Sequence, residues 1–145
     1  MRREYIDNIL SRSFGQFRKI QKDYELTMRQ RNTLLKRIKD GESKKDDLHF
    51  WNTKFAELAE TYLLYRKIYF DFVEEHIPQI HEKLPKYQIA LSYHSTVEEK
   101  RHPGEDIQSC IIRYLRENQE RDILTGHTPI GPHRDDFDFV IETKH

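Results

Sequence analysis

The fold is decided by residues 48–76, which read LHFWNTKFAELAETYLLYRKIYFDFVEEH. Large apolar residues recur here at alternating steps of three and four, the spacing that lines one face of an α-helix over several heptads. They are Leu48, Trp51, Phe55, Leu58, Tyr62, Tyr65, Tyr69 and Phe72, and His76 continues the series. Because proline lacks the N–H that a helix needs, Pro78 predicts that this helix ends or kinks near residues 75–77.

A second helical pattern occupies residues 14–39, immediately before the first. Ser13 and Gln16 fit a capping box at its start, and Gly41 fits the position after its end. A turn centred on residue 43 brings the apolar residues of both helices into register. The expected pairs are Ile38 with Leu48, Leu35 with Trp51, Met28 with Leu58, Tyr24 with Tyr62, Phe17 with Tyr69 and Phe14 with Phe72. We therefore predict a long antiparallel, coiled-coil-like helical hairpin.

The rest of the chain predicts a further helix and a small β element. Residues 2–10 favour a short helix, and residues 105–124 favour a longer one that stops before Gly126. Residues 87–93 and 137–141 alternate apolar with polar side chains, which is typical of strands, while residues 94–104 indicate a loop. We therefore expect a mainly α fold with a small β element, a single domain over residues 1–145.

The charged residues are unevenly distributed, although 25 Lys/Arg and 25 Asp/Glu give a net charge of 0. Residues 1–45 hold 13 basic and 6 acidic side chains, and the remainder holds 12 and 19. This asymmetry indicates either an interaction surface, with DNA phosphates as the candidate ligand, or two helix faces that attract each other. The candidate phosphate-binding residues lie on the first long helix: Arg18, Lys19, Lys22, Arg29, Lys36, Arg37 and Lys39.

Several classes of protein and of catalytic site are disfavoured by the residues present. The single cysteine, Cys110, excludes an internal disulfide and a cysteine cluster for metal, and it indicates a cytoplasmic setting. No apolar run approaches the roughly 18–20 residues of a membrane span. The sequence contains neither a phosphate-binding glycine loop ending in Lys-Ser or Lys-Thr nor a G-x-S-x-G nucleophile motif. We expect no enzymatic activity and no bound cofactor from these residues alone.

The densest polar cluster is residues 127–136, which read HTPIGPHRDD. Residues 133–135 match the catalytic-loop triplet of protein kinases, but Val140 stands where that motif needs Asn. A second interpretation is a carboxylate and imidazole metal site for a hydrolase. A third is structural, with Gly131-Pro132 making a rigid turn before a strand. The residues available to the metal site are His127, His133, Asp135 and Asp136.

Arg31 interrupts the apolar face of the first long helix, at the position expected to lie opposite Phe55. A polar residue at such a position can act as a device that fixes helix register. Alternatively, the guanidinium extends outward to water, binds a carboxylate, or lies over an aromatic ring such as Trp51.

Four short motifs occur in a distinctive order along the chain. Residues 2–7 read RREYID, residues 30–36 read QRNTLLK after Tyr24, residues 48–51 read LHFW with Ala59 and Arg66 following, and residues 128–136 read TPIGPHRDD. They resemble the R-R-x-F-L-D, Q-R-N-x-L-L-K, L-x-x-W and T-x-x-G-P-H-R-D-D motifs of the RecF family of bacterial DNA replication and repair ATPases. The motif residues with no assigned role are Arg2, Arg3, Asp7, Gln30, Arg31, Asn32, Trp51, Gly131, Pro132, His133, Arg134, Asp135 and Asp136.

The resemblance implies an internal piece of an SMC-like ABC ATPase, namely the arm domain that extends from the ATPase head. The family's P-loop is expected before Arg2, and its signature and magnesium-binding segments after Phe139. ATP and magnesium are therefore implied for the full-length protein only, as is the homodimer that forms through the head. The implied partners are DNA, RecR and RecO, in the loading of recombinase at gaps, with no membrane. The alternative is a self-contained coiled-coil interaction module without a DNA role.

Overall fold

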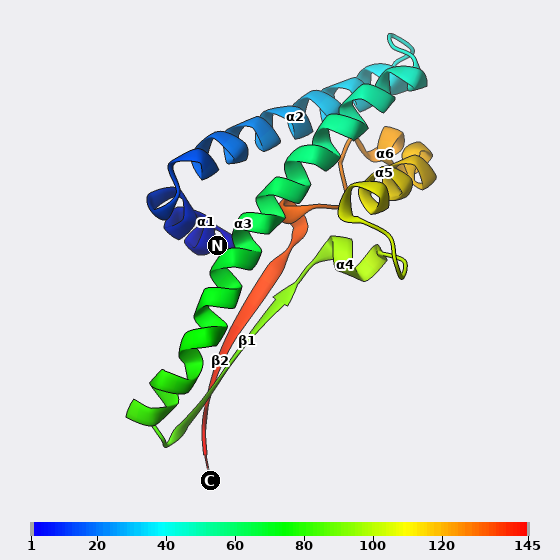
Figure 1. Cartoon of the computed structure of the whole chain (residues 1–145). Coiled ribbons are helices and arrows are strands. Elements are labelled where there is room, and N and C mark those ends of the chain that lie inside the picture. Colours follow the sequence, from blue (N-terminus) through cyan, green and yellow to red (C-terminus); the bar gives the residue numbers. More distant parts are fainter. Residues whose placement is uncertain (1, 145) are drawn as a thin grey trace.

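The computed structural model describes residues 2–144, with the Arg2 side chain excepted. Its elements form an elongated, mainly helical molecule with one β ribbon (Figure 1). In chain order they are α1 (Arg2–Ser13), α2 (Gly15–Lys39), η1 (Lys45–Asp47), α3 (Leu48–Lys83), β1 (Tyr87–His94), α4 (Thr96–Lys100), α5 (Ile107–Glu117), α6 (Gln119–Thr125), η2 (Pro132–Arg134) and β2 (Asp136–Thr143). The predicted fold class is confirmed.

The two longest helices, α2 and α3, form the predicted helical hairpin, and the other elements pack around it (Figure 1). Gly41 ends α2 with a positive φ of 77°, and its N–H bonds to the Ile38 carbonyl at 3.0 Å. The chain can then turn back because glycine adopts this left-handed conformation without steric strain. The capping box was wrong, because Ser13 belongs to α1 and Phe14 occupies the N-cap position without a side-chain bond.

The register of the hairpin agrees with the prediction near its middle and differs from it towards the start of α2. Tyr24 packs on Tyr62, as expected, with ring centroids 5.1 Å apart. Phe17 instead contacts Tyr62 and Tyr65 rather than Tyr69, and Phe14 also contacts Tyr65. The buried face of α3 therefore consists of residues that only partly coincide with the predicted apolar face. Its members are Leu48, Asn52, Phe55, Ala56, Ala59, Tyr62, Arg66 and Phe70.

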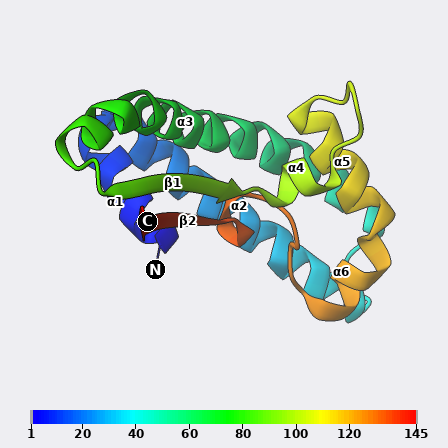
Figure 2. The same ribbon diagram turned by 90° about the horizontal axis from the view of Figure 1, so that it is seen from below.

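Helix α3 continues through Pro78 to Lys83, so of the two alternatives the end at residues 75–77 was wrong. The last turns of α3 are held by the β ribbon that lies along them (Figure 2). Ile89 of β1 is buried, and its N–H donates to Nε2 of His81 at 3.0 Å. Packing of this kind offsets the loss of about 3 kcal/mol that a proline imposes on a helix interior.

The β ribbon is a two-stranded antiparallel sheet in which Tyr87 pairs with Thr143 and His94 with Asp136. The predicted strands are confirmed, whereas the predicted loop contains the short helix α4. The predicted helix over residues 105–124 is divided at Asn118 into α5 and α6, which flank the end of the hairpin where α2 and α3 meet (Figure 1).

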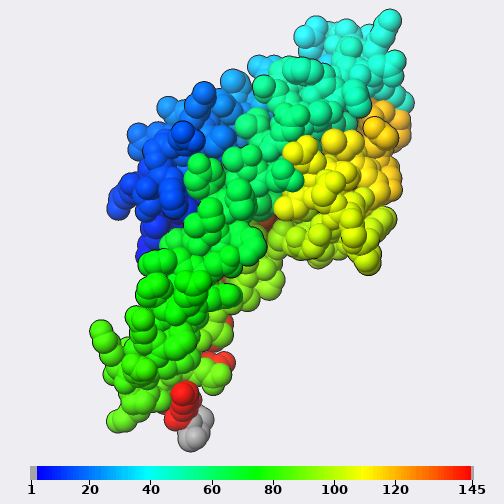
Figure 3. Space-filling model, in the orientation of Figure 1, coloured from blue at the N-terminus to red at the C-terminus, as the bar shows by residue number. Residues whose placement is uncertain are grey.

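One main hydrophobic core lies where α1, α2, α3, α5 and the ribbon meet, and a smaller cluster lies near the hairpin turn. The space-filling view shows α3 as a continuous ridge along the molecule (Figure 3). No helix within residues 2–144 is long and apolar enough to cross a membrane.

Candidate functional site

Arg31 of α2 is completely buried and is tied to three other parts of the chain. Nε donates to Oδ1 of Asn52 at 2.7 Å, Nη1 to the Thr128 hydroxyl at 2.9 Å, and Nη2 to the Asp122 carboxylate at 2.9 Å. Burial lowers the pKa of Arg31 and raises that of Asp122, and the contact between the two opposes both shifts. Arg31 is therefore an internal tie that joins α2 to α3, to α6 and to the segment before η2.

Arg66, which lies half-way along α3, is also buried and joins several elements. It donates twice to the Asp7 carboxylate, at 3.0 and 2.9 Å, and also to the Pro132 carbonyl at 2.9 Å and to the Tyr93 hydroxyl at 2.8 Å. Burial lowers the pKa of Arg66, but the contacts with Asp7, Tyr93 and Tyr62 together outweigh burial, so that its pKa is raised overall. One side chain thus connects α1, α3, β1 and η2.

The Asp135 carboxylate, just before β2, is also buried and is linked to Arg66 through the Tyr93 hydroxyl. We call the buried hydrogen bonds of Arg31, Arg66 and Asp135 the network. It accepts hydrogen bonds from the Tyr93 hydroxyl at 2.6 Å and from the backbone N–H and hydroxyl of Thr96 at 2.8 and 2.9 Å. Burial raises the pKa of Asp135, and the bonds from Tyr93 and Thr96 oppose that rise. These contacts fix the start of α4 against the start of β2.

His133 is held by Tyr24 and Thr128 in a single tautomer. A carbonyl can only accept, so Nε2 of His133 carries the hydrogen that bonds to the Thr128 carbonyl at 2.7 Å. Nδ1 therefore accepts from the Tyr24 hydroxyl, 2.5 Å away. Burial lowers the pKa of His133 to about 4, so the ring is neutral at physiological pH.

Gly131 permits the close approach of η2 to the hairpin. Its φ of 122° is a conformation that favours glycine, and a Cβ at this position would lie 2.6 Å from the Tyr24 hydroxyl. The shape of the turn thus depends on two restrictions at Gly131, the backbone conformation and the space available for a side chain. Residues 128–135 bind both helices of the hairpin, through Arg31, Tyr24 and Arg66, which supports the structural interpretation of this cluster.

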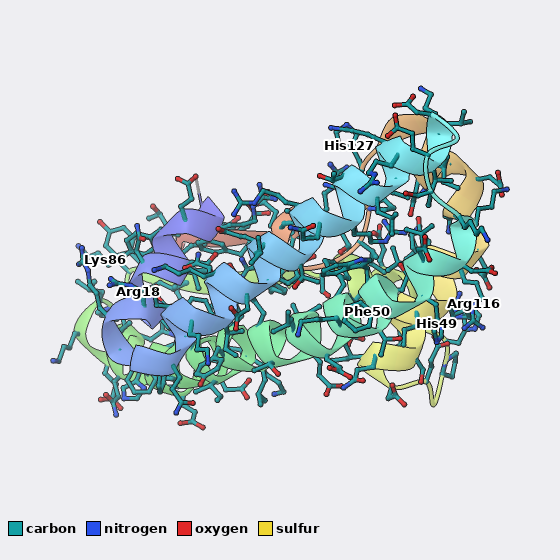
Figure 4. The ribbon with its side chains drawn as sticks, turned by 90° about the horizontal axis from the view of Figure 1, so that it is seen from above. Arg18, His49, Phe50, Lys86, Arg116 and His127 are labelled. Atoms are coloured by element: carbon teal, nitrogen blue, oxygen red, sulfur yellow. The ribbon has the colours of Figure 1, made fainter. Side chains whose placement is uncertain are left out.

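The structure does not bring the proposed metal ligands together. His127 is exposed (Figure 4), and the side chains of His133 and Asp135 bond to different protein groups. Asp136 accepts from the backbone N–H of Phe137 at 2.9 Å. Within residues 2–144, no group of three His, Cys, Asp or Glu residues is arranged to hold a metal ion.

The remaining motif residues divide into inward and outward positions. Arg3 donates to the Asp135 carbonyl at 3.0 Å, and Asn32 accepts from the Thr128 hydroxyl at 2.7 Å, so both join the network. Trp51 is half-buried and packs edge-on against Phe50, whereas Gln30 and Arg134 are exposed. The Arg2 side chain lies outside the described residues.

The candidate phosphate-binding residues are all exposed on α2. Arg18, Lys22, Arg29 and Lys36 follow one another at steps of four, seven and seven, which places them along one face of the helix. Glu25 is an acidic residue on the same face of the helix. Arg18 projects outward near the start of α2 (Figure 4). We call these four basic residues the α2 basic row.

The other three candidates lie beside the row or take part in local contacts. Lys19 is exposed, Arg37 lies 4.0 Å from the Glu42 carboxylate, and Lys39 donates to the Leu124 carbonyl at 3.3 Å. Within the described residues, no ion pair joins α2 to α3. Apolar and aromatic packing, together with the buried hydrogen bond from Arg31 to Asn52, therefore joins the two helices, rather than ion pairs between charged faces.

Several network residues carried no signal that the sequence alone could resolve. Asn52 and Arg66 are polar residues on the buried face of α3, and the interruption of an apolar face could have marked both. Arg66 also belongs to the motifs that resemble RecF, but the resemblance assigned it no role. Tyr93, Thr96 and Asp122 lie in elements whose relative placement depends on tertiary contacts. Their roles follow from the structure.

Comparison with known proteins relates the chain to RecF. The DNA replication and repair protein RecF of Ruminiclostridium cellulolyticum is 28% identical over 146 residues, covering 99% of this chain and 39% of that protein. RecF of Tropheryma whipplei is 30% identical over 142 residues, covering 98% and 36%. The chain thus spans about two fifths of the length of the curated relatives it matches. No protein-family model matches it.

Two solved structures share its fold. They are described as the recombination mediator protein RecF in the RecFOR pathway, one with ATPrS and one with ATP. Each has a TM-score of 0.83 and covers 97% of this chain and 38% of the solved one, at 24% and 25% identity. Sequence and fold therefore agree in relating the chain to one segment of RecF, and in this sense it is a RecF-like segment.

Proposed function

We propose that the chain is the arm of a RecF-like repair protein and that the α2 basic row contacts the phosphates of DNA. The observation that carries this proposal is the row itself: Arg18, Lys22, Arg29 and Lys36 are exposed on one face of a long helix. Lysine and arginine side chains that neutralise phosphates provide binding that does not depend on base sequence. Such binding suits a protein that acts at DNA gaps of any sequence.

The dimensions of the row fit a DNA backbone. From Arg18 to Lys36 the helix rises by roughly 27 Å, at about 1.5 Å per residue. Duplex DNA rises about 3.4 Å per base pair along each strand, so the row matches about eight base pairs. Four basic side chains over that length would provide contacts along a groove edge or a single strand.

The buried network gives this arm its stiffness. Arg31 and Arg66 lie on the two helices of the hairpin, and both bind the segment of residues 128–135. A load on α2 would therefore be transmitted to α3, to α1 and to the start of β2 without bending the hairpin. The proposed mechanical role is that of a rigid lever between DNA and the remainder of the repair protein.

The wider activity of RecF proteins is proposed for the complete protein. It comprises ATP and magnesium binding, ATP-dependent dimerisation, and work with RecR and RecO to load recombinase. Support comes from the solved RecF structures, which are described with ATP or ATPrS and within the RecFOR pathway. In this proposal, the residues described above hydrolyse no ATP themselves.

Fluorescence anisotropy of labelled duplex DNA tests the proposal on this chain. We expect binding at low salt that weakens steeply as salt is added, because each phosphate contact releases counterions. Sedimentation of the same sample distinguishes the alternative function. A stable dimer that binds no DNA even at low salt would favour the coiled-coil interaction module and contradict the DNA-binding arm.

A further inference from the structure

The outer face of α3 carries an apolar stripe that no part of residues 2–144 covers. Leu64, Ile68 and Phe72 retain 55%, 46% and 58% of their surface in contact with solvent. Because they are spaced four residues apart, they lie one above another on a single face of the helix. Three large apolar side chains in line exceed the scattered exposure that is normal on protein surfaces.

A groove adjoins this stripe where α3 meets α4 and α5. Its volume is about 490 Å³, and Leu64 belongs to both the stripe and the groove wall. The space-filling view shows the ridge of α3 next to α4 and α5 (Figure 3). The other apolar residues lining the groove are Leu63, Phe70, Tyr93 and Ile107. Stripe and groove meet at Leu64, and we call the two together the α3 surface.

Acidic residues border the α3 surface. Glu57 and Asp71 lie seven residues before and after Leu64, and Glu75 lies seven residues after Ile68, so all three are close to the line of the stripe. Glu60 lies on the groove side. Lys67 is the exposed basic residue in this stretch, and its charge is offset by Asp71 at 2.7 Å. The border is therefore negative.

We propose that the α3 surface binds an amphipathic helix of a partner protein whose apolar side is flanked by lysine or arginine. An apolar stripe beside a groove is the form of surface that receives such a helix, through anchors spaced three or four residues apart. The acidic border selects a basic partner and speeds its association. It also disfavours DNA, because carboxylates repel phosphates.

The same charges argue against a second copy of this chain as the occupant. A two-fold contact places the same patch on both subunits, so Glu57 and Glu75 of one copy would face the like-charged border of the other. Like-charge juxtaposition across an interface is unfavourable. The α3 surface also lies on a different helix from the α2 basic row, so one arm can hold DNA and a protein partner together.

The test uses a labelled synthetic peptide of about five helical turns, with leucines at helical spacing on one side and lysines on both flanks. We expect anisotropy to show saturable binding to the wild-type chain. The variant I68S/F72S should bind at least about tenfold more weakly, because two apolar contacts are lost. L26S is the matched control, since Leu26 is equally exposed on α2, and it should bind like wild type.

Charge reversal provides a second, independent test. The variant E57K/E75K should lose the lysine-flanked peptide and should prefer a peptide of the same leucine pattern flanked by glutamate. The proposal is overturned if I68S/F72S and L26S bind the lysine-flanked peptide equally, or if reversal leaves the preference unchanged. It is also overturned if sedimentation shows a wild-type dimer that I68S/F72S abolishes, because the stripe would then be a contact between copies.

Discussion

The Arg66 guanidinium binds both oxygens of the Asp7 carboxylate, with Nε 3.0 Å from Oδ1 and Nη2 2.9 Å from Oδ2. The Tyr62 hydroxyl donates to the same carboxylate at 2.6 Å, and the Tyr62 ring lies 4.7 Å below the Arg66 guanidinium carbon. Two-point binding of this kind fixes orientation as well as distance. It anchors α1 against the middle of α3, far from the hairpin turn.

Replacing Arg66 with Met should strongly destabilise the chain. The substitution leaves the Asp7 carboxylate buried without a counter-charge and removes one of the two donors to the Pro132 carbonyl, which together cost about 3–5 kcal/mol. Urea unfolding followed by circular dichroism measures the effect. The neighbouring variant K67M removes an exposed pair and should cost less than about 1 kcal/mol. Equal losses in both variants would contradict the role of Arg66.

Replacing Gly131 with Ala should destabilise the chain more than the same change at Gly41. Both residues have positive φ, but only the Gly131 Cβ would meet another group, the Tyr24 hydroxyl at 2.6 Å, while Gly41 has open space around it. Strain alone costs about 1 kcal/mol, and overpacking adds about 1–3 kcal/mol. Thermal unfolding of G131A and G41A compares the two, and equal shifts would show that space at residue 131 is unimportant.

His133 should make folding weaken as the solution is acidified. Its pKa is about 4 in the folded chain, below the ordinary 6.5, so the unfolded chain binds more protons between these values. The free energy of unfolding therefore falls as pH drops from about 6.5 towards 4, by up to about 3 kcal/mol.

The variant H133N isolates this contribution. Asparagine does not titrate, so the difference in stability between wild type and H133N should shrink as pH falls through that window. The buried carboxylates Asp122 and Asp135 have raised pKa values, which act in the opposite direction, but both remain in the variant and cancel from the difference. A difference that does not change with pH would show that His133 does not carry the effect.

The hairpin could be predicted because apolar spacing reports directly on a helix face, and Gly41 marks where the first helix stops. Pro78 misled the prediction, since local propensity is weak against packing by the β ribbon. The register also shifted, because aromatic side chains as large as Phe17 and Tyr65 can meet at more than one offset along a heptad pattern.

The sequence marked some members of the buried network but did not predict which residues they bind. Arg31 stands out as a charge on an apolar face, but its carboxylate partner, Asp122, lies 91 positions away on a helix that was not expected to be separate. The role of Gly131 depends on the Tyr24 hydroxyl, a contact between residues 107 positions apart that no local pattern encodes. Pairings of this kind are set by the tertiary fold.

The central claim, that the α2 basic row binds DNA, is tested most directly by the salt dependence of duplex binding. The variant R18Q/K22Q/R29Q is compared with K54Q/K86Q/R116Q, which removes three exposed charges from other elements. Each lost phosphate contact should lower the slope of log K against log salt by about 0.9, so the row variant should lose about 2–3 and the control much less. Equal slopes in wild type and the row variant would contradict the account.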